Sequence, residues 1–429
     1  MPAVIVWFKT DLRLHDNEAL VRAVASGHMV VPVYCFDQSH YTTTRFGFRK
    51  TGDFRIKFLL ESLADLDARL RSMGSGLLIV KGDPSLALPD VVKKYNAKKV
   101  FAKKEVASEE KATEEKVTAQ LWKLGCSLET YSTSTLYHAE DLPFSIKDIP
   151  DIFTDFRKKT ERDSFIRPVF DKPSKIMSPV IPPLKLPDVT ELKAAHVIPD
   201  TRASIEFKGG ETEARSRLED FLFGTKSIAT YKETRDWLTG RDFSSKLSPW
   251  LANGCLSPRT VYNEVKRYEA EYGANKSTYW LIFELLWRDF FRFMMKKHKS
   301  KMFYKGGFKG RDVETATINS EMLYKWVNGQ TGNDFVDANM RELKLTGFMS
   351  NRGRQNVASY LCNDLGIDWR YGAAYFEQQL IDYDVCSNWG NWAYIAGVGN
   401  DPRGNRQFNV DKQAADYDPK QLYRKLWLQ

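Results

Sequence analysis

The stretches TGFMSNRGRQNVASYL (346–361) and DWRYGAAYFEQQLIDYDVCSNWGNWAYIAGVGND (368–401) decide how the second half of this chain folds. Arg352 and Arg354 fall on one predicted helix, and Asp382 and Asp384 follow about one helical hairpin later. These charges stand where the flanking apolar pattern predicts a core. Because buried charges need partners, a structural ion pair between Arg354 and Asp382 is one interpretation.

A second group of residues directly behind the acids favours another interpretation. Asn388, Trp389, Asn391 and Trp392 add amide hydrogen-bonding groups and flat aromatic faces to the same few turns. A planar cofactor with polar edges needs both kinds of group when it is buried. The stretch therefore predicts a cofactor site in a helical core.

Composition limits the classes of protein to consider. The 429 residues suffice for two domains, and the net charge of +9 favours an anionic partner such as nucleic acid, although many basic proteins have none. The cysteines are scattered without CxxC spacing, so we expect reduced thiols and no disulfide framework or metal site. The most apolar segment, YWLIFELLWRDFFRFMM (279–295), contains four charged residues and does not predict a membrane span.

The first 135 residues alternate short apolar runs with amphipathic stretches. The runs AVIVWF (3–8), MVVPVYCF (29–36), LLIVKG (77–82), KKVFA (98–102) and CSLETYS (126–132) are the expected strands. Helices are expected from about Asn17, over 52–73, near 88–95 and over 108–124. This alternation predicts an α/β domain with a five-stranded parallel, Rossmann-like sheet. No GxGxxG follows the first strand, so ligands are expected at the carboxyl ends of strands.

The rest of the chain divides into a connector and a helical part. Residues 136–208 are rich in Pro and short polar runs and predict a long connector that wraps a surface. From residue 209 to 429 helical periodicity dominates. We therefore expect an α/β domain, a connector and an all-α domain.

Two further motifs extend the pattern to both ends of the chain: WFKTDLRLHDN (7–17) and QFNVDKQAADYDP (407–419). Together with residues 346–401 they closely resemble the photolyase/cryptochrome flavoproteins, in wording similar to the DASH-type branch. The resemblance implies FAD in the helical domain and an antenna chromophore on the α/β domain.

The resemblance assigns the FAD phosphates to a motif in the helical domain. The matching residues are Tyr231, Ser244, Ser245, Lys246, Leu247 and Ser248. Free N–H groups and hydroxyls at a helix N-terminus suit a pyrophosphate, but simple N-capping by the serines is the alternative. The family's usual Thr and Arg are Ser244 and Lys246 here, and Lys lacks the bidentate fork of Arg.

The flavin ring and ribityl positions of the family match Arg288, Arg354, Asp382, Asp384 and Asn388. A buried guanidinium favours the anionic reduced flavin. Asp382 would hold Arg354 and Asp384 would accept from ring N3–H. Asn388 would face flavin N5, where signalling cryptochromes carry an acid or a thiol, so the Asn favours repair.

By family position Trp392 and Trp369 are the inner members of the tryptophan chain that reduces the flavin, although buried aromatic residues are by default core. The outermost member is replaced by Ala316, so Tyr324 or Trp326 would have to substitute. Slower or shorter-lived photoreduction is the expected result.

The resemblance also implies a substrate, a cyclobutane pyrimidine dimer. Glu284 and Asn351 would bond its carbonyl edges while Trp287 stacks on it; a Glu284–Arg288 pair within the helix is the alternative. Tyr394 and Gln355 depart from the repair photolyases and favour single-stranded DNA. Arg352 and Arg406 are candidate phosphate contacts, or simply solvated arginines.

Glu105, after the expected strand KKVFA, matches a family position that contacts the pterin of 5,10-methenyltetrahydrofolate. A carboxylate accepts from a pterin N–H and amino group together. An ordinary surface Glu at a helix start is the alternative.

The resemblance thus implies a blue-light-dependent enzyme, a deoxyribodipyrimidine photo-lyase, that repairs dimers preferentially in single-stranded DNA. A photoreceptor or transcriptional regulator without turnover is the rival, disfavoured by the chain's end at Gln429 without a long tail. A flavin redox enzyme lacks a nicotinamide fingerprint. We expect an intracellular monomer, cytoplasmic or nuclear, or organellar if a transit peptide was trimmed; RNA is a further candidate partner.

Overall fold

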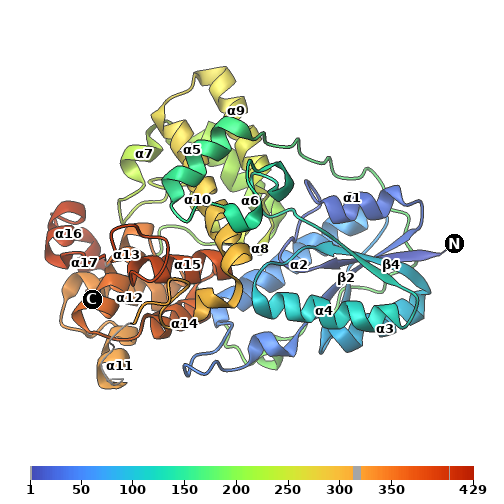
Figure 1. The fold of residues 1–429 in the computed structure, drawn as a ribbon, viewed down its shortest axis with the longest axis horizontal. Helices are drawn as coiled ribbons and strands as arrows, with labels where there is room; N and C mark the ends of the chain where they lie inside the picture. Colours follow the sequence, from blue (N-terminus) through green and yellow to red (C-terminus); the bar gives the residue numbers. More distant parts are fainter. Residues whose placement is uncertain (1, 313–319, 405) are drawn as a thin grey trace.

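The N-terminal region is a five-stranded parallel sheet covered by helices, as the sequence predicted. The computed structural model describes residues 2–312, 320–404 and 406–429 (Figure 1). The strands are β1 (Ala3–Phe8), β2 (Met29–Phe36), β3 (Leu78–Lys81), β4 (Ala97–Lys103) and β5 (Ser127–Tyr131). They lie in the order β3-β2-β1-β4-β5, and every neighbouring pair is parallel.

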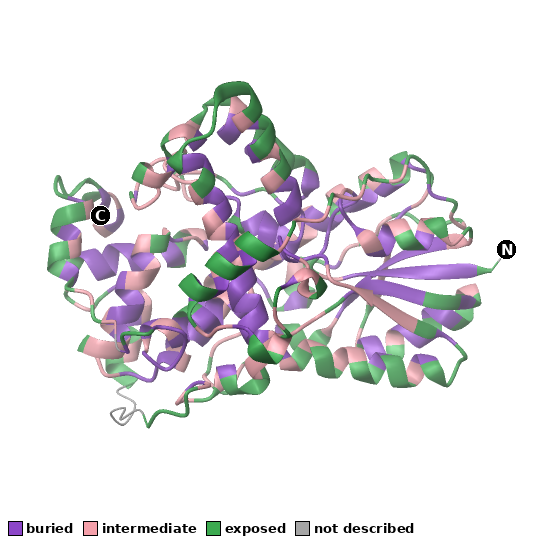
Figure 2. Ribbon diagram, turned by 45° about the horizontal axis from the view of Figure 1, so that its top comes forward, coloured by how far each residue is buried: buried purple, intermediate pink, exposed green. Residues whose placement is uncertain are grey.

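The central strand β1 divides its side chains between two cores. Ala3, Ile5 and Trp7 join one apolar cluster with residues of the outer helices. The alternate residues Val4, Val6 and Phe8 join a cluster that continues into the helical region. Since both faces are covered, the whole strand is buried and its sequence is apolar throughout. Figure 2 shows the buried strands beside helices whose outer faces are exposed.

The helices of this region are α1 (Glu18–Ala25), α2 (Asp53–Ser72), α3 (Pro84–Tyr95) and α4 (Ser108–Trp122). Helix α3 begins before the predicted start at residue 88. Asp83 accepts from the backbone N–H of Ser85, and Pro84 occupies the first turn, where its missing N–H costs nothing. These capping residues lie before the periodic apolar residues from which the helix was predicted, so α3 begins earlier than residue 88.

The connector contains one helix that the sequence did not predict, α5 (Phe153–Asp163). Only Phe153, Phe156 and Thr160 are buried in it, so its apolar period is too short to stand out. The remainder of residues 136–208 runs without long elements and attaches to the α/β region through backbone hydrogen bonds, such as Val30 N–H to Met177 O (2.8 Å).

The remaining residues are mainly helical, with no strand in their described part. The helices are α6 (Glu211–Glu219), α7 (Tyr231–Thr234), α8 (Ser248–Asn253), α9 (Pro258–Tyr272), α10 (Lys276–His298), α11 (Ser320–Asn328), α12 (Asp334–Thr346), α13 (Asn351–Ser359), α14 (Trp369–Gln379), α15 (Val385–Ile395), α16 (Val410–Tyr417) and α17 (Leu422–Leu428). Figure 1 shows α10 at the centre, between the sheet and the orange and red helices α12 to α17. No helix among the described residues has the length and apolar content to span a bilayer.

Candidate functional site

A cavity of about 490 Å³ opens in the helical region, within the range typical of cofactor sites. Its walls come from α7, α8, α10, α13 and α15 and the segments joining them. All of the cofactor residues predicted from the sequence line it: Tyr231, Ser244, Ser245, Lys246, Leu247, Ser248, Arg288, Arg354, Asp382, Asp384 and Asn388. Residues separated by more than 150 positions thus meet around one space.

The predicted ion pair between Arg354 and Asp382 is confirmed. Arg354 Nη2 lies 2.8 Å from Asp382 Oδ2, and Arg354 Nε donates to Met349 O at 2.9 Å. The other carboxylate oxygen, Asp382 Oδ1, is buried and has no hydrogen-bond partner among the described residues. An unpaired buried acceptor is costly, so a bound ligand that donates to it would stabilise this wall.

Asp384 and Asn388 lie at the start of α15. Asp384 Oδ1 accepts from the N–H and the hydroxyl of Ser387, at 2.8 and 2.7 Å. Burial alone would raise the pKa of Asp384, but Arg288 and Arg292 and these hydrogen bonds hold the pKa below its ordinary value. Asn388 Nδ2 donates to Ala373 O at 2.9 Å, which leaves its carbonyl oxygen to accept from a ligand.

Arg288 joins α10 to α8 and to the segment that directly follows β5. Its guanidinium donates to the backbone oxygens of Ser134 and, at 3.1 Å, Leu251. Because these partners are neutral carbonyls, the charge of Arg288 acts on the cavity wall, where it lowers the pKa of Asp384.

The serine-rich segment does not serve as a helix cap. The residue before α8 is Leu247, and no side chain there makes a capping hydrogen bond, so the N-capping alternative is wrong. Arg217 instead shapes the segment by donating to Ser244 O and Ser245 O, at 3.2 and 3.1 Å. Lys246 is buried, and burial lowers its pKa to about 8 although Glu342 opposes this effect, so an anionic ligand beside Lys246 would stabilise its charged form.

Glu284, Trp287, Asn351, Gln355 and Tyr394, the predicted substrate residues, also line the cavity. Glu284 forms its ion pair with Arg235 of the segment after α7. Burial raises the pKa of Glu284, and Arg235 opposes this effect. The Glu284–Arg288 alternative is therefore wrong, since Arg288 points to backbone oxygens. Sequence reasoning missed Arg235, although it stands one turn after Tyr231.

The two aromatic residues of this group meet edge to face. The rings of Trp287 and Tyr394 lie 6.0 Å apart with an interplanar angle of 86°. The other side of Trp287 is covered by Phe153 of α5, with ring centroids 3.7 Å apart and an angle of 13°. One wall of the cavity is thus an ordered aromatic surface.

The two candidate phosphate contacts are both engaged with acids. Arg352 pairs with Asp236 at 2.8 Å, and Arg406 pairs with Asp401 at 2.6 Å. Arg406 lines the cavity and lies over the ring of Tyr394, whereas Arg352 is not part of the lining. The alternative that Arg352 and Arg406 are only solvated is therefore wrong. To contact a DNA phosphate, each arginine would have to give up its ion pair.

The predicted electron-transfer tryptophans are all buried. Trp392 lines the cavity, and its ring lies 6.2 Å from that of Trp326. Trp369 lies 5.7 Å from Trp389. The position of the replaced tryptophan, Ala316, lies outside the described residues.

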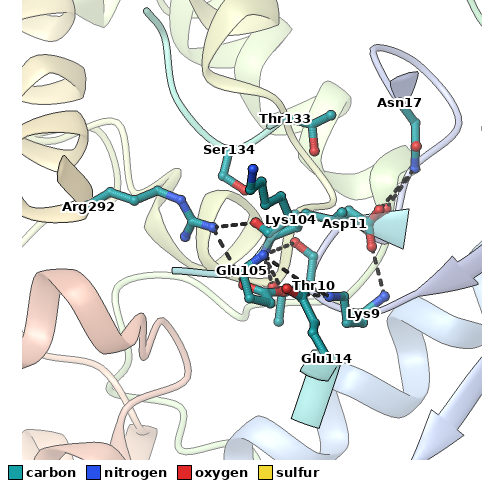
Figure 3. Close-up of polar contacts among 12 residues, drawn as sticks. Lys9, Thr10, Asp11, Asn17, Lys104, Glu105, Glu114, Thr133, Ser134 and Arg292 are labelled. Atoms are coloured by element: carbon teal, nitrogen blue, oxygen red, sulfur yellow. Dashed lines mark hydrogen bonds and ion pairs between the residues drawn. The ribbon is translucent and has the colours of Figure 1, made fainter. Parts of the chain in front are cut away.

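Glu105, the candidate antenna contact, lies in a buried network between the α/β region and α10 (Figure 3). Lys103, Lys9 and Arg292 approach its carboxylate at 3.3, 3.5 and 3.5 Å. Burial would raise the pKa of Glu105, but these cations lower it to about 2. The ordinary surface Glu expected as the alternative is therefore wrong.

The fold agrees with that of the solved proteins that this chain matches. The DNA photolyase family matches residues 4–174, and the FAD-binding domain of DNA photolyase matches residues 280–429. Among solved structures, a bacterial class III photolyase from Agrobacterium tumefaciens has a TM-score of 0.86 at 28% identity, covering 100% of this chain and 86% of its own. These matches define a photolyase-type flavoprotein.

More similar relatives narrow the class. Cryptochrome DASH of Synechocystis sp. is 50% identical over 100% of this chain and 87% of its own, and a Synechocystis cryptochrome crystal structure gives a TM-score of 0.96 at 50% identity, covering 100% and 89%. Cryptochrome DASH of Danio rerio is 48% identical, over 99% of this chain and 82% of its own. The chain therefore belongs to the photolyase/cryptochrome family, in its DASH cryptochrome branch.

Proposed function

We propose that this chain repairs cyclobutane pyrimidine dimers in DNA by blue light, with FAD in the cavity and with a preference for single strands. The observation that carries the proposal is that one cavity holds both predicted residue sets. Arg354, Asp382 and Asn388 form its cofactor part, while Glu284 and Trp287 face the same space.

The residues fit FAD on chemical grounds. The unpaired oxygen Asp382 Oδ1 accepts from a ligand donor, and the buried cation Lys246 gains a pyrophosphate as its partner. When bound and reduced, FAD supplies the light-excited electron that splits the dimer. Arg354 and Arg288 would stabilise negative charge on a reduced flavin, and the carbonyl of Asn388 would accept a hydrogen bond from it.

The dimer is held by a few polar groups and aromatic walls. Glu284 and Asn351 bond its edges, and Trp287 and Tyr394 exclude water from its faces. A single-stranded lesion avoids part of the flipping cost of a few kcal/mol. Arg352 and Arg406 already pair with Asp236 and Asp401. Their contacts to the backbone of a duplex would therefore add little binding energy to offset the cost of flipping the dimer out.

We also assign 5,10-methenyltetrahydrofolate to the neighbourhood of Glu105 as the antenna. The cation contacts there are longer than good charge-assisted hydrogen bonds, so the carboxylate retains capacity to accept from a pterin. Substitution of Glu105→Gln is expected to lower folate retention while FAD stays bound. Equal folate absorbance in both proteins would refute this assignment.

The relatives carry the name cryptochrome, which favours a second candidate, a blue-light photoreceptor or transcriptional regulator without repair turnover. One assay separates the two. Reduced holoprotein is illuminated with dimer-containing single-stranded or duplex oligonucleotides, and restored thymines are counted. Repair is expected mainly on the single strand, lost in Trp287→Ala and kept in Trp122→Ala, an exposed tryptophan of α4. Binding without restored thymines would favour the receptor.

A further inference from the structure

The connector helix α5 lies antiparallel along α10, the helix that carries Glu284 and Trp287 (Figure 1). Before α5, Asp151 Oδ1 accepts from Lys297 Nζ at 2.9 Å and lies 2.6 Å from His298 Nε2. Near the other end, Tyr279 donates to Glu161 at 2.7 Å. The segment is thus attached to both ends of α10.

Aromatic packing fills the space between these attachments. Phe156 is fully buried against Phe290 and Phe293 of α10, with ring centroids 5.4 and 5.9 Å apart. Phe153, one turn earlier, is itself held by Phe283 and Phe290, at 5.2 and 5.6 Å. Because rings of α10 contact it at two points, Phe153 has little freedom to move.

Phe153 is placed to control one residue of the cavity. Its ring lies almost parallel to that of Trp287, with centroids 3.7 Å apart, so one indole face is covered from outside the cavity. Phe291 and Tyr394 limit rotation from two further sides, at 5.6 and 6.0 Å. Trp287 is still part of the cavity lining.

We propose that Phe153 is a positioning residue for the recognition of the pyrimidine dimer, acting through Trp287. By covering one face of the indole, it fixes the orientation in which Trp287 meets a base in the cavity. Such pre-organisation increases affinity because the side chain is ordered before the ligand binds. This inference rests on the proposed function, and it gives the connector a role beyond joining two regions.

The test compares two phenylalanines of the same helix. Phe153→Leu keeps an apolar side chain but removes the flat ring behind Trp287. The matched control Phe156→Leu alters the packing on Phe144, Phe290 and Phe293 and leaves the ring of Phe153 on Trp287 in place. Holoprotein affinity is measured for dimer-containing and undamaged single-stranded oligonucleotides. From the strength of aromatic pairs, we expect Phe153→Leu to reduce the preference for the dimer about fivefold. The affinity of Phe153→Leu for the undamaged strand and its FAD content should stay unchanged. Phe156→Leu should keep the preference of the wild type for the dimer.

A Trp287→Leu background completes the cycle. There, Phe153→Leu should have no further effect on the preference, because its target is gone. An equal loss in Phe153→Leu and Phe156→Leu, or an undiminished effect in the Trp287→Leu background, would overturn the positioning role alone. If Trp287→Leu itself retains the full preference, the proposed use of Trp287 fails, and the inference fails with it.

Discussion

Glu284 pairs with Arg235, a residue of another segment, although Arg288 stands one turn away on the same helix. The pairing leaves Arg288 to the backbone oxygens of Ser134 and Leu251 and keeps Glu284 in the lining of the cavity. A buried carboxylate that pairs with a single cation can be held in one orientation without losing its charge.

Substitution of Arg235→Gln should therefore weaken dimer binding. Without the cation, burial is unopposed, so the pKa of Glu284 rises further and its orientation is lost. Loss of a charged hydrogen bond predicts about a tenfold lower affinity at neutral pH, with FAD still bound. Titration with a dimer-containing oligonucleotide measures this effect. Arg241→Gln is the control, because Arg241 is largely exposed and pairs with Asp220; equal affinities in the two variants would contradict the role of Arg235.

The affinity for FAD should depend on pH through Lys246. Burial lowers the pKa of Lys246 to about 8, and only its protonated form attracts a pyrophosphate. Above this pH, Lys246 must take up a proton when FAD binds. The Kd for FAD should therefore rise about tenfold per pH unit, up to the pKa that Lys246 has in the complex. The Kd is measured by equilibrium titration between pH 7 and about 9.5 in wild type and in Lys246→Arg. In Lys246→Arg the Kd should not change with pH, because arginine keeps its charge over this range. Parallel profiles in the two proteins would exclude Lys246.

Trp326 should take part in photoreduction. Its ring lies 6.2 Å from that of Trp392, and its indole N–H donates to Val357 O, which fixes its orientation. Trp326→Phe should shorten the lifetime of the tryptophan radical seen by transient absorption after a flash. Trp427→Phe, a buried tryptophan of α17, serves as the control. Identical decay in wild type and Trp326→Phe would remove Trp326 from the path.

Asp289 should make stability fall with rising pH. It accepts the N–H groups of Leu136 and Tyr137, both at 2.9 Å, and burial raises its pKa from 3.8 to about 7 despite these bonds. Between those values the folded state binds more protons than the unfolded state, so the free energy of unfolding decreases as pH rises.

Asp289→Asn removes that titration. From pH 5 to 8, wild type should lose on the order of 2 kcal/mol more unfolding free energy than the variant does. Urea unfolding measures the difference, and the exposed Asp155→Asn should behave as wild type. A pH dependence shared by all three proteins would show that Asp289 titrates normally.

The sequence predicted the parallel sheet because period and strand spacing are local properties. Its long motifs also pointed to residues that the fold brings together around one cavity, and their role in binding a cofactor stays a prediction. Partners from distant segments were not predictable in the same way. Arg235 and Phe153 meet α10 only after the chain has folded, and nothing in their own neighbourhoods marks them. Helix α5 was missed because three buried residues give too little periodicity. Glu105 was expected at a strand end, but not the three cations that surround it.

If the cavity places a reduced flavin beside a pyrimidine dimer, as proposed, the dimer should quench the fluorescence of the reduced flavin. The measurement is the fluorescence lifetime of the reduced flavin in the holoprotein, with dimer-containing or undamaged single-stranded DNA. Electron transfer to a neighbouring dimer should shorten the lifetime with the damaged strand only, and the shortening should be lost in Trp287→Ala. A lifetime that is the same with both strands, at saturating DNA, would contradict the account.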